Sequence, residues 1–353
     1  MAGRSRATRT RTYAASGVNR SQVTKALAEL LRAARYIAPA SHGRPLDAPG
    51  HYAGIVRVGR ETLAVTTDTV GTKVLLAEKL GRWEEVGEDT VAINVNDLAS
   101  VGARPVGIVD TILCAQPDAP IFRAIGRGLA RGLAAARCSL LGGETAVVGE
   151  IVRGIDLGAT AFGVFPDGRT PVLGERIRPG DAIVGIPSTG IHANGFTLVR
   201  RLLDESRVDL RRPRPGARLG VGRELLTPTR TYSEFADALA ELPGVHGFAH
   251  ISGGGVRNLP RLNRHVRFNL DSWPTPPPLF RWLQELGGLS DREMFETFNA
   301  GIGFVIVVAG SQAGAIRRRL ARAGARDSVV IGHVEKGRGV VVPPRDLRYE
   351  GYS

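Results

Sequence analysis

The sequence predicts a mixed α/β (α+β) protein built from two domains. Its length of 353 residues exceeds the size of one ordinary hydrophobic core, so two domains are expected. Short apolar runs typical of strands alternate with amphipathic helices in both halves, without a strict strand–helix–strand rhythm. Gly and Pro residues interrupt this pattern at 168–174, and we place the boundary near residue 170, between domains 1–170 and 171–353.

The elements of the first half follow in chain order. Apolar side chains at helical spacing predict helices at 21–36 and 120–136, and a loop rich in Gly, Pro and His is expected at 41–54. The remaining apolar runs are short and bounded by turn residues, which is typical of strands. The predicted strands are 62–67, 91–95, 105–113, 139–141 and 157–165.

The second half continues with the same mixture. Residues 205–222 are polar and rich in Arg and Pro, which indicates a surface segment. Four prolines between 274 and 278 predict a rigid loop before the last predicted helix. The predicted helices are 195–204, 231–241 and 279–286, and the predicted strands are 182–186, 302–308 and 329–334.

Composition and charge exclude several classes of protein. The 47 Lys and Arg residues against 34 Asp and Glu give a net charge of +13, including a basic tail at 1–12. Nucleic-acid binding is one reading of this excess, but the aromatic residues do not interleave with the arginine clusters as a stacking platform requires. Two cysteines exclude a disulfide scaffold and favour a reducing, cytoplasmic location. No apolar run is long enough to predict a membrane span.

Three acidic residues occupy similar places in the sequence. Asp68, Asp97 and Glu144 each follow a short apolar run predicted as a strand, next to Gly, Thr or Asn. Strand ends converge in space, and carboxylate oxygens are the ligands that Mg²⁺ prefers. The sequence therefore predicts a Mg²⁺ site from these acids, with Lys73 close enough to hold a phosphate. The alternative is three ordinary turn acids.

Glycine-rich loops provide the second candidate feature. Residues 142–143 and 253–255 can bring backbone N–H groups close to an anion, and the loop 188–195 precedes a predicted helix. His192 and His250 lie in these loops, where they could donate to phosphate or shuttle a proton. His246 and His333 fit ordinary structural roles. The sequence lacks the glycine-rich motifs of P-loop and dinucleotide-binding folds, so any nucleotide must be held differently.

These motifs, in this order, resemble the aminoimidazole ribonucleotide synthetase (phosphoribosylformylglycinamidine cyclo-ligase) family of the PurM-like superfamily. Residues 68–73 read Asp-Thr-Val-Gly-Thr-Lys, similar to the family's Asp-Gly-Val-Gly-Thr-Lys element. Residues 97–105 fit the wider Asp-x4-Gly-Ala-x-Pro signature. Further matches lie at 142–145, 188–195, 227–230, 250–255 and 298–303, so the resemblance covers about residues 13–340.

The resemblance implies a fold and an activity. The first half would supply four strands that pair with four from a second subunit to close a barrel, and the second half would form an α/β sandwich. The implied reaction is ATP-dependent cyclisation of formylglycinamidine ribonucleotide in purine biosynthesis, with Mg²⁺, in a homodimer. Catalysis would involve Lys73, Asp97, His192 and His250. The expected ATP and phosphate contacts are Asp68, Thr69, Gly71, Thr72, Lys73, Asn96, Gly142, Gly143, Thr145, Asn194, Gly253 and Gly254.

The sequence also departs from the family pattern. Residues 49–54 replace a longer glycine-rich loop, Thr69 replaces a glycine, and Val147 and Val148 replace a common Met-Pro. These changes concern the ATP-phosphate contacts rather than the fold. The alternatives are another ATP-using member of the superfamily, such as a thiamine monophosphate kinase, or a basic nucleic-acid-binding protein. The reactive cysteines that selenophosphate synthetase and the hydrogenase maturation member use are absent from the corresponding places.

Overall fold

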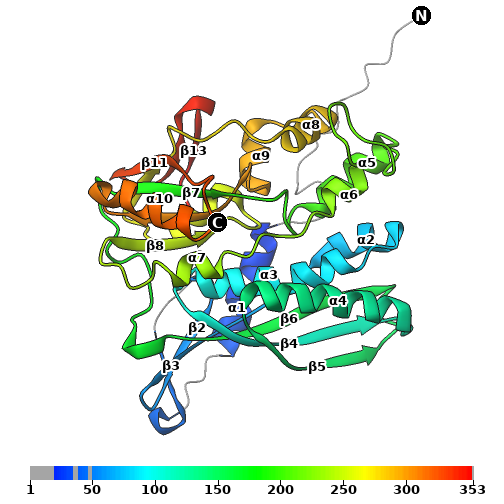
Figure 1. The fold of residues 1–353 in the computed structure, drawn as a ribbon, viewed down its shortest axis with the longest axis horizontal. Helices are drawn as coiled ribbons and strands as arrows, with labels where there is room; N and C mark the ends of the chain where they lie inside the picture. Colours follow the sequence, from blue (N-terminus) through cyan, green and yellow to red (C-terminus); the bar gives the residue numbers. More distant parts are fainter. Residues whose placement is uncertain (1–19, 35–38, 47–49, 352–353) are drawn as a thin grey trace, which may run out of the picture.

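The computed structural model describes residues 20–34, 39–46 and 50–351. Residues 1–19, which include the basic tail, lie outside the described part of the chain. Two sheets with their helices form the molecule, and in Figure 1 the sheet of the first half lies below that of the second. This mixture of strands and helices confirms the predicted mixed α/β class. No helix in the described ranges is both long and apolar enough to cross a membrane.

The first sheet has six strands in the order β1-β2-β3-β6-β4-β5. All its neighbouring strands are antiparallel except the parallel pair β4 and β5. Four of the predicted strands are confirmed, and β5 extends six residues beyond its predicted end at 141. The strands are β1 (Arg44–Pro45), β2 (Gly54–Val58), β3 (Glu61–Thr69), β4 (Arg104–Cys114), β5 (Ser139–Val147) and β6 (Ile155–Val164).

Helices cover one face of this sheet. Figure 1 shows α3 (Glu84–Ala99) and α4 (Ala119–Ala136) lying across it. Two further helices, α1 (Arg20–Ala33) and α2 (Val74–Leu80), precede them in the sequence. The two long helices pack closely because Gly128 has no side chain: a Cβ there would clash with the carbonyl of Glu84. Asp118 caps α4 by accepting the N–H of Ile121, and the predicted helix at 120–136 is confirmed.

The predicted strand at 91–95 is wrong, because these residues lie inside α3. This helix contacts the first sheet, helix α4 and, in the second half of the chain, strand β8 (Val245–His250), so apolar side chains are buried around its whole circumference. An apolar run of five residues fits a buried helix and a buried strand equally well. Asp97 therefore lies near the end of a helix and not at a strand end.

The first sheet also carries exposed apolar side chains. Val106 on β4 and Phe162 on β6 are exposed, as are three residues of the edge strand β5. Those three are Leu140, Leu141 and Val147. An apolar sheet face next to an open edge is typical of a surface that another chain covers.

The second sheet has seven strands in the order β13-β12-β9-β11-β7-β10-β8. Ile183 of β7 faces one apolar cluster, whereas Val184 and Ile186 face the other, so the sheet has a core on both sides. The strands are β7 (Ala182–Pro187), β8 (Val245–His250), β9 (Val266–Asn269), β10 (Ile302–Val308), β11 (Val329–Lys336), β12 (Gly339–Val342) and β13 (Leu347–Tyr349).

Helices pack on both faces of this second sheet. Phe235 and Ile316 belong to the cluster beneath α7 and α10, and Leu202 and Leu283 to the cluster beneath α5 and α8. The predicted helices at 195–204 and 279–286 are confirmed, and the one predicted at 231–241 is shorter. The helices are α5 (Phe196–Glu205), α6 (Val221–Leu225), α7 (Ser233–Asp237), α8 (Pro278–Gly287), α9 (Asp291–Thr297) and α10 (Ala313–Arg322).

Candidate active site

Asp68 and Asp97 lie near each other at the junction of the two halves. Asp68 is next to the end of β3 and keeps solvent contact. Surrounding atoms desolvate its carboxyl and the charge of Asp97 opposes ionisation, which together raise the pKa of Asp68 to about 6. The backbone N–H of Thr69 donates to Asp68 Oδ1 at 2.8 Å and works in the opposite direction. The two carboxylates form the solvent-facing part of the site.

Asp97 also reaches across to the second half of the chain. Its Oδ1 lies 3.1 Å from Nδ1 of His250, at the end of β8. The Ser100 hydroxyl accepts the backbone N–H of His250 at 3.0 Å, and the Tyr52 hydroxyl donates to its carbonyl at 3.1 Å. Asp97 therefore orients the ring while two further bonds hold the backbone of His250, and Nε2 of the ring is buried without a hydrogen-bond partner among the described residues. With Nδ1–H donating to Asp97, Nε2 holds a lone pair that can accept a proton.

His192 lies beside His250, with ring centroids 6.1 Å apart. Complete burial lowers the pKa of His192 well below its usual value, and the charges of His250, Lys73 and Arg230 lower it further. The ring is therefore neutral at physiological pH. Its Nε2 is 3.5 Å from the hydroxyl of Tyr232, whose own pKa burial raises. The two histidines thus differ: His192 is a neutral hydrogen-bonding group, whereas Nε2 of His250 is free to accept a proton.

Lys73 occupies the interior beneath these residues. Its ammonium nitrogen lies 2.6 Å from Asp89 Oδ2 and donates to the carbonyls of His192 at 3.0 Å and Thr227 at 3.1 Å. Both charged side chains are fully buried. Asp89 in turn accepts from the N–H and the hydroxyl of Thr229. Lys73 therefore joins the first half to two loops of the second half, and its predicted phosphate contact stays a prediction.

The glycine-rich loops converge on the same junction. A Cβ at Gly253 would lie 2.8 Å from Asn194 Oδ1, so Gly253 lets the two loops pack together. The Thr72 hydroxyl is 3.0 Å from the hydroxyl of Thr197, which places residues 71–72 against the start of α5. The Asn96 side chain donates to the carbonyl of Arg230 and accepts the backbone N–H of Tyr232. The sequence did not indicate this structural role.

Glu144 is in a different place. It lies with Gly142, Gly143 and Thr145 on the exposed edge strand β5. Within the described ranges no group of three His, Cys, Asp or Glu side chains is arranged to hold a metal ion. The structure brings together Asp68, Asp97 and His250, but it does not assemble the predicted three-acid site within one chain.

Sequence reasoning missed several residues of the junction. Asp89 neutralises Lys73, Tyr232 packs against His192, and Tyr52 supports His250. Asn299 holds the 188–195 loop by donating to the carbonyl of Gly190 at 2.9 Å. Asp89 follows Glu88 in an acidic stretch before the apolar run 91–95, so nothing in the local sequence indicated that this carboxylate is buried and needs a partner.

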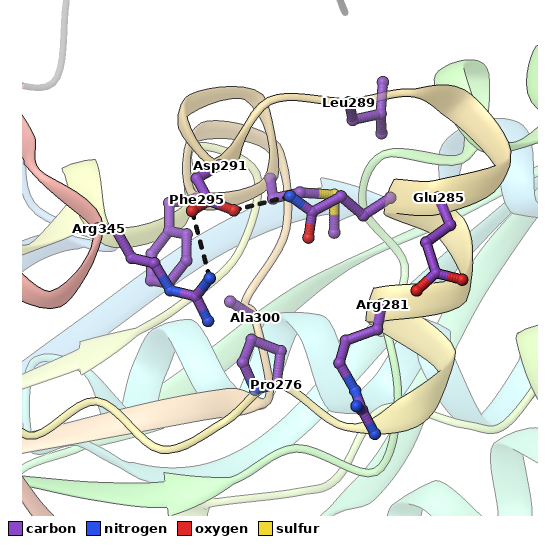
Figure 2. A pocket seen from close by; sticks show the side chains of 10 residues that line it. Pro276, Arg281, Glu285, Leu289, Asp291, Phe295, Ala300 and Arg345 are labelled. Atoms are coloured by element: carbon purple, nitrogen blue, oxygen red, sulfur yellow. Dashed lines mark hydrogen bonds and ion pairs between the residues drawn. The ribbon is translucent and has the colours of Figure 1, made fainter.

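Two cavities lie elsewhere on the described surface. An open cavity of about 420 Å³ beside β3 is lined by His51, Tyr52 and Thr66 among others, so the segment that replaces the family's glycine-rich loop forms part of its wall. The second, of about 410 Å³, lies between α8 and α9 (Figure 2). There Asp291 accepts from Gln284 at 2.7 Å and from Arg345 at 3.2 Å. None of the predicted site residues lines either cavity.

Comparison with family models identifies both halves of the chain. Residues 50–165 match the N-terminal domain of AIR synthase related protein, and residues 178–343 match its C-terminal domain. The phosphoribosylformylglycinamidine cyclo-ligase of Methanosarcina barkeri is 43% identical over 299 residues, covering 84% of this chain and 88% of that protein. The same enzyme of Thermococcus kodakarensis is 42% identical over 300 residues, with the same coverage.

Solved structures show the same fold at low sequence identity. The structure described as AaThiL complexed with AMPPCP and TMP has a TM-score of 0.65 at 16% identity and covers 99% of both chains. HypE in the HypE-HypF complex has a TM-score of 0.64 at 17% identity, covering 90% of this chain and 95% of that one. These neighbours confirm the predicted PurM-like fold, and the sequence relatives confirm the family. The chain belongs to the phosphoribosylformylglycinamidine cyclo-ligase family.

Proposed function

We propose that the protein closes the imidazole ring of aminoimidazole ribonucleotide from formylglycinamidine ribonucleotide with ATP, a step of purine biosynthesis, in the cytoplasm. The observation that carries the proposal is the Asp97–His250 pair, whose free Nε2 lies where the family motifs converge. A ring closure of this kind needs a base next to an anion-binding surface. Asp68 and the glycine loops are the candidates for that surface.

The reaction has two parts. The formamide oxygen attacks the γ-phosphorus of ATP, the bond to the β-phosphate oxygen breaks, and ADP leaves. The substrate's amine nitrogen then attacks the activated carbon, the C–O bond breaks, and phosphate leaves. Phosphate is a good leaving group where an amide oxygen is a poor one, and positioning and charge neutralisation supply most of the catalysis of phosphoryl transfer.

The two histidines take different roles in this scheme. His250 Nε2 accepts the proton that the attacking nitrogen loses, and Asp97 stabilises the resulting imidazolium. His192 stays neutral because its pKa is lowered by burial, so it serves as a hydrogen-bonding and positioning group. Lys73 positions His192 by holding its carbonyl.

Asp68 and Asp97 fit a Mg²⁺ site because both offer hard carboxylate oxygens at the open side of the junction. A bound Mg²⁺ would neutralise phosphate charge. Glu144 is distant from them within the chain, and we propose that a second subunit supplies it. The exposed edge strand β5 and the apolar side chains of the same sheet support a homodimer through this face.

A direct assay tests the activity. Purified protein with formylglycinamidine ribonucleotide, ATP and Mg²⁺ should yield aminoimidazole ribonucleotide, ADP and phosphate. Phosphorylation of thiamine monophosphate in place of this reaction would assign the chain to the alternative kinase function. Omission of ATP is the control.

Subunit complementation tests the shared site separately. We expect Asp68→Asn and Glu144→Gln to be inactive alone, and the mixed sample, after dissociation and reassociation, to regain about a quarter of wild-type activity, because half the dimers would carry one intact site of two. Light scattering should give about twice the chain mass of 37.6 kDa. No recovery from a mixture that does form mixed dimers would place Glu144 outside the site of Asp68.

A further inference from the structure

A second histidine–aspartate pair lies at the other end of strand β8. His246 Nδ1 is 2.7 Å from Asp181 Oδ2, and the two side chains are only 7% and 3% exposed. The backbone N–H of Arg178 also donates to Asp181 Oδ2, which fixes the carboxylate. No residue in the described part of the chain bonds to Nε2 of His246. The reaction proposed above makes no use of this pair.

His246 lines a cavity of about 610 Å³ that is separate from the candidate active site. One wall is the segment 168–176, which joins β6 to β7, and the other is formed by residues 240–243 with His246. This volume is typical of small-molecule sites. Leu173 in the first wall forms a β-bridge to Gly247, so the cavity lies between the inter-sheet segment and the start of β8.

Two arginines line this cavity, and they differ in whether a carboxylate neutralises their charge. Arg169 is already paired with Asp237 and with Glu241. Arg176 donates to the carbonyls of Pro243 at 3.1 Å and Val245 at 2.7 Å, and no described carboxylate forms an ion pair with it. These bonds hold a guanidinium at the cavity without removing its charge.

Glu175 and Glu241 also line the cavity, but of its two arginines only Arg169 forms ion pairs among the residues that the structure describes, so the guanidinium of Arg176 is the one that faces a ligand with its charge unpaired. Asp181 holds Nδ1 of His246, which leaves Nε2 as the ring atom that can bond to a ligand in the cavity. A phosphate group can accept from a guanidinium and share a hydrogen bond with an imidazole nitrogen.

We propose that this cavity binds a small phosphate-bearing molecule, with His246 Nε2 and the Arg176 guanidinium as its anion contacts. The ligand would fix the segment that joins the two sheets. The shared chemistry is the phosphate group, either as inorganic phosphate or as a phosphate monoester.

Histidine ring NMR on the full-length protein tests the proposal independently of turnover. Inorganic phosphate, and ribose 5-phosphate in a parallel titration at constant ionic strength, should shift the His246 resonance saturably. Tighter binding of ribose 5-phosphate would identify a monoester site, and tighter inorganic phosphate a free-anion site. His246→Asn assigns the resonance, since Asn keeps a donor to Asp181 and removes Nε2. Its phosphate affinity, followed by calorimetry, should fall about tenfold or more.

Arg176→Gln gives a second test that keeps the His246 signal visible. We expect about a tenfold weaker phosphate response at His246, because a charge-assisted contact is lost. Arg178→Gln is the matched control, since it removes an equal charge two residues away from a side chain that does not line the cavity. An unperturbed His246 resonance in wild-type protein, or equal weakening in both arginine variants, would overturn the proposal.

Discussion

Strand β8 carries a histidine–aspartate pair at each end, and the two pairs are built differently. At one end Asp97 comes from α3 of the first half and His250 from the second half, at a sequence separation of 153. At the other end Asp181 and His246 both belong to the second half. The geometry of the first pair therefore depends on how the two halves pack, and the geometry of the second does not.

The buried ion pair below the junction explains how that packing is held. Lys73 and Asp89 are fully buried and bind loops of the second half through carbonyls, an N–H and a hydroxyl. Breaking one partner of such a pair leaves an uncompensated buried charge, which is strongly destabilising. The Asp97–His250 pair is thus supported by long-range contacts that the Asp181–His246 pair does not need.

The largest expected effect comes from His250→Asn. Asn keeps a donor toward Asp97 but removes Nε2, and loss of a general base typically lowers turnover by about 10²- to 10⁴-fold. Steady-state cyclo-ligase kinetics at saturating ATP measure this. His333→Asn, at a histidine whose side chain is 45% exposed on β11, is the control and should retain wild-type turnover. More than a tenth of wild-type turnover in His250→Asn would remove Nε2 from the chemistry.

Lys73→Met is expected to have the second largest effect. The substitution leaves the Asp89 carboxylate buried without its cation, so the free energy of unfolding should fall by about 3–5 kcal/mol in urea titrations. Lys79→Met breaks the exposed pair with Asp204 and should cost less than about 1 kcal/mol. Similar losses in the two variants would show that the buried pair does not hold the halves together.

The sequence predicts the elements that bury a single face, and it fails where an element is buried on all sides. Period-two alternation identified β3, and helical spacing identified α4, because each element buries one face. The run 91–95 was misassigned because α3 is buried on every side and shows no periodicity. The motifs at Asp68 and His250 predicted site residues; the structure brings both near Asp97, and their role in the site stays a prediction.

The other junction residues that the sequence did not predict are joined by hydrogen bonds between positions far apart in the sequence. Asp89 meets Thr229 across 140 residues, and Asn96 meets Tyr232 across 136. No local pattern encodes such a pairing, since it arises only when the second half docks onto α3. Glu144 was grouped with Asp68 on the strength of its motif, whereas the fold puts it on an exposed edge.

The smallest expected effect concerns Asp68, on the solvent-facing side of the Asp97–His250 pair. The pKa of Asp68 is about 6 in the folded protein against an ordinary value of 3.8, so the folded state keeps a proton there that the unfolded state has released. Wild-type stability should therefore fall as pH rises from about 4 to about 6, with the full cost present above pH 6.

Asp68→Asn removes this cost. Its gain over wild type should be absent near pH 4 and reach about 1 kcal/mol or less above pH 6, since the side chain is solvent-screened. Thermal unfolding between pH 4 and 8, without ATP or Mg²⁺, measures the difference, and Asp346→Asn on the exposed surface should give a flat difference. A gain for Asp68→Asn that is equal at all pH values would mean that Asp68 ionises normally and that its place beside Asp97 carries no electrostatic cost.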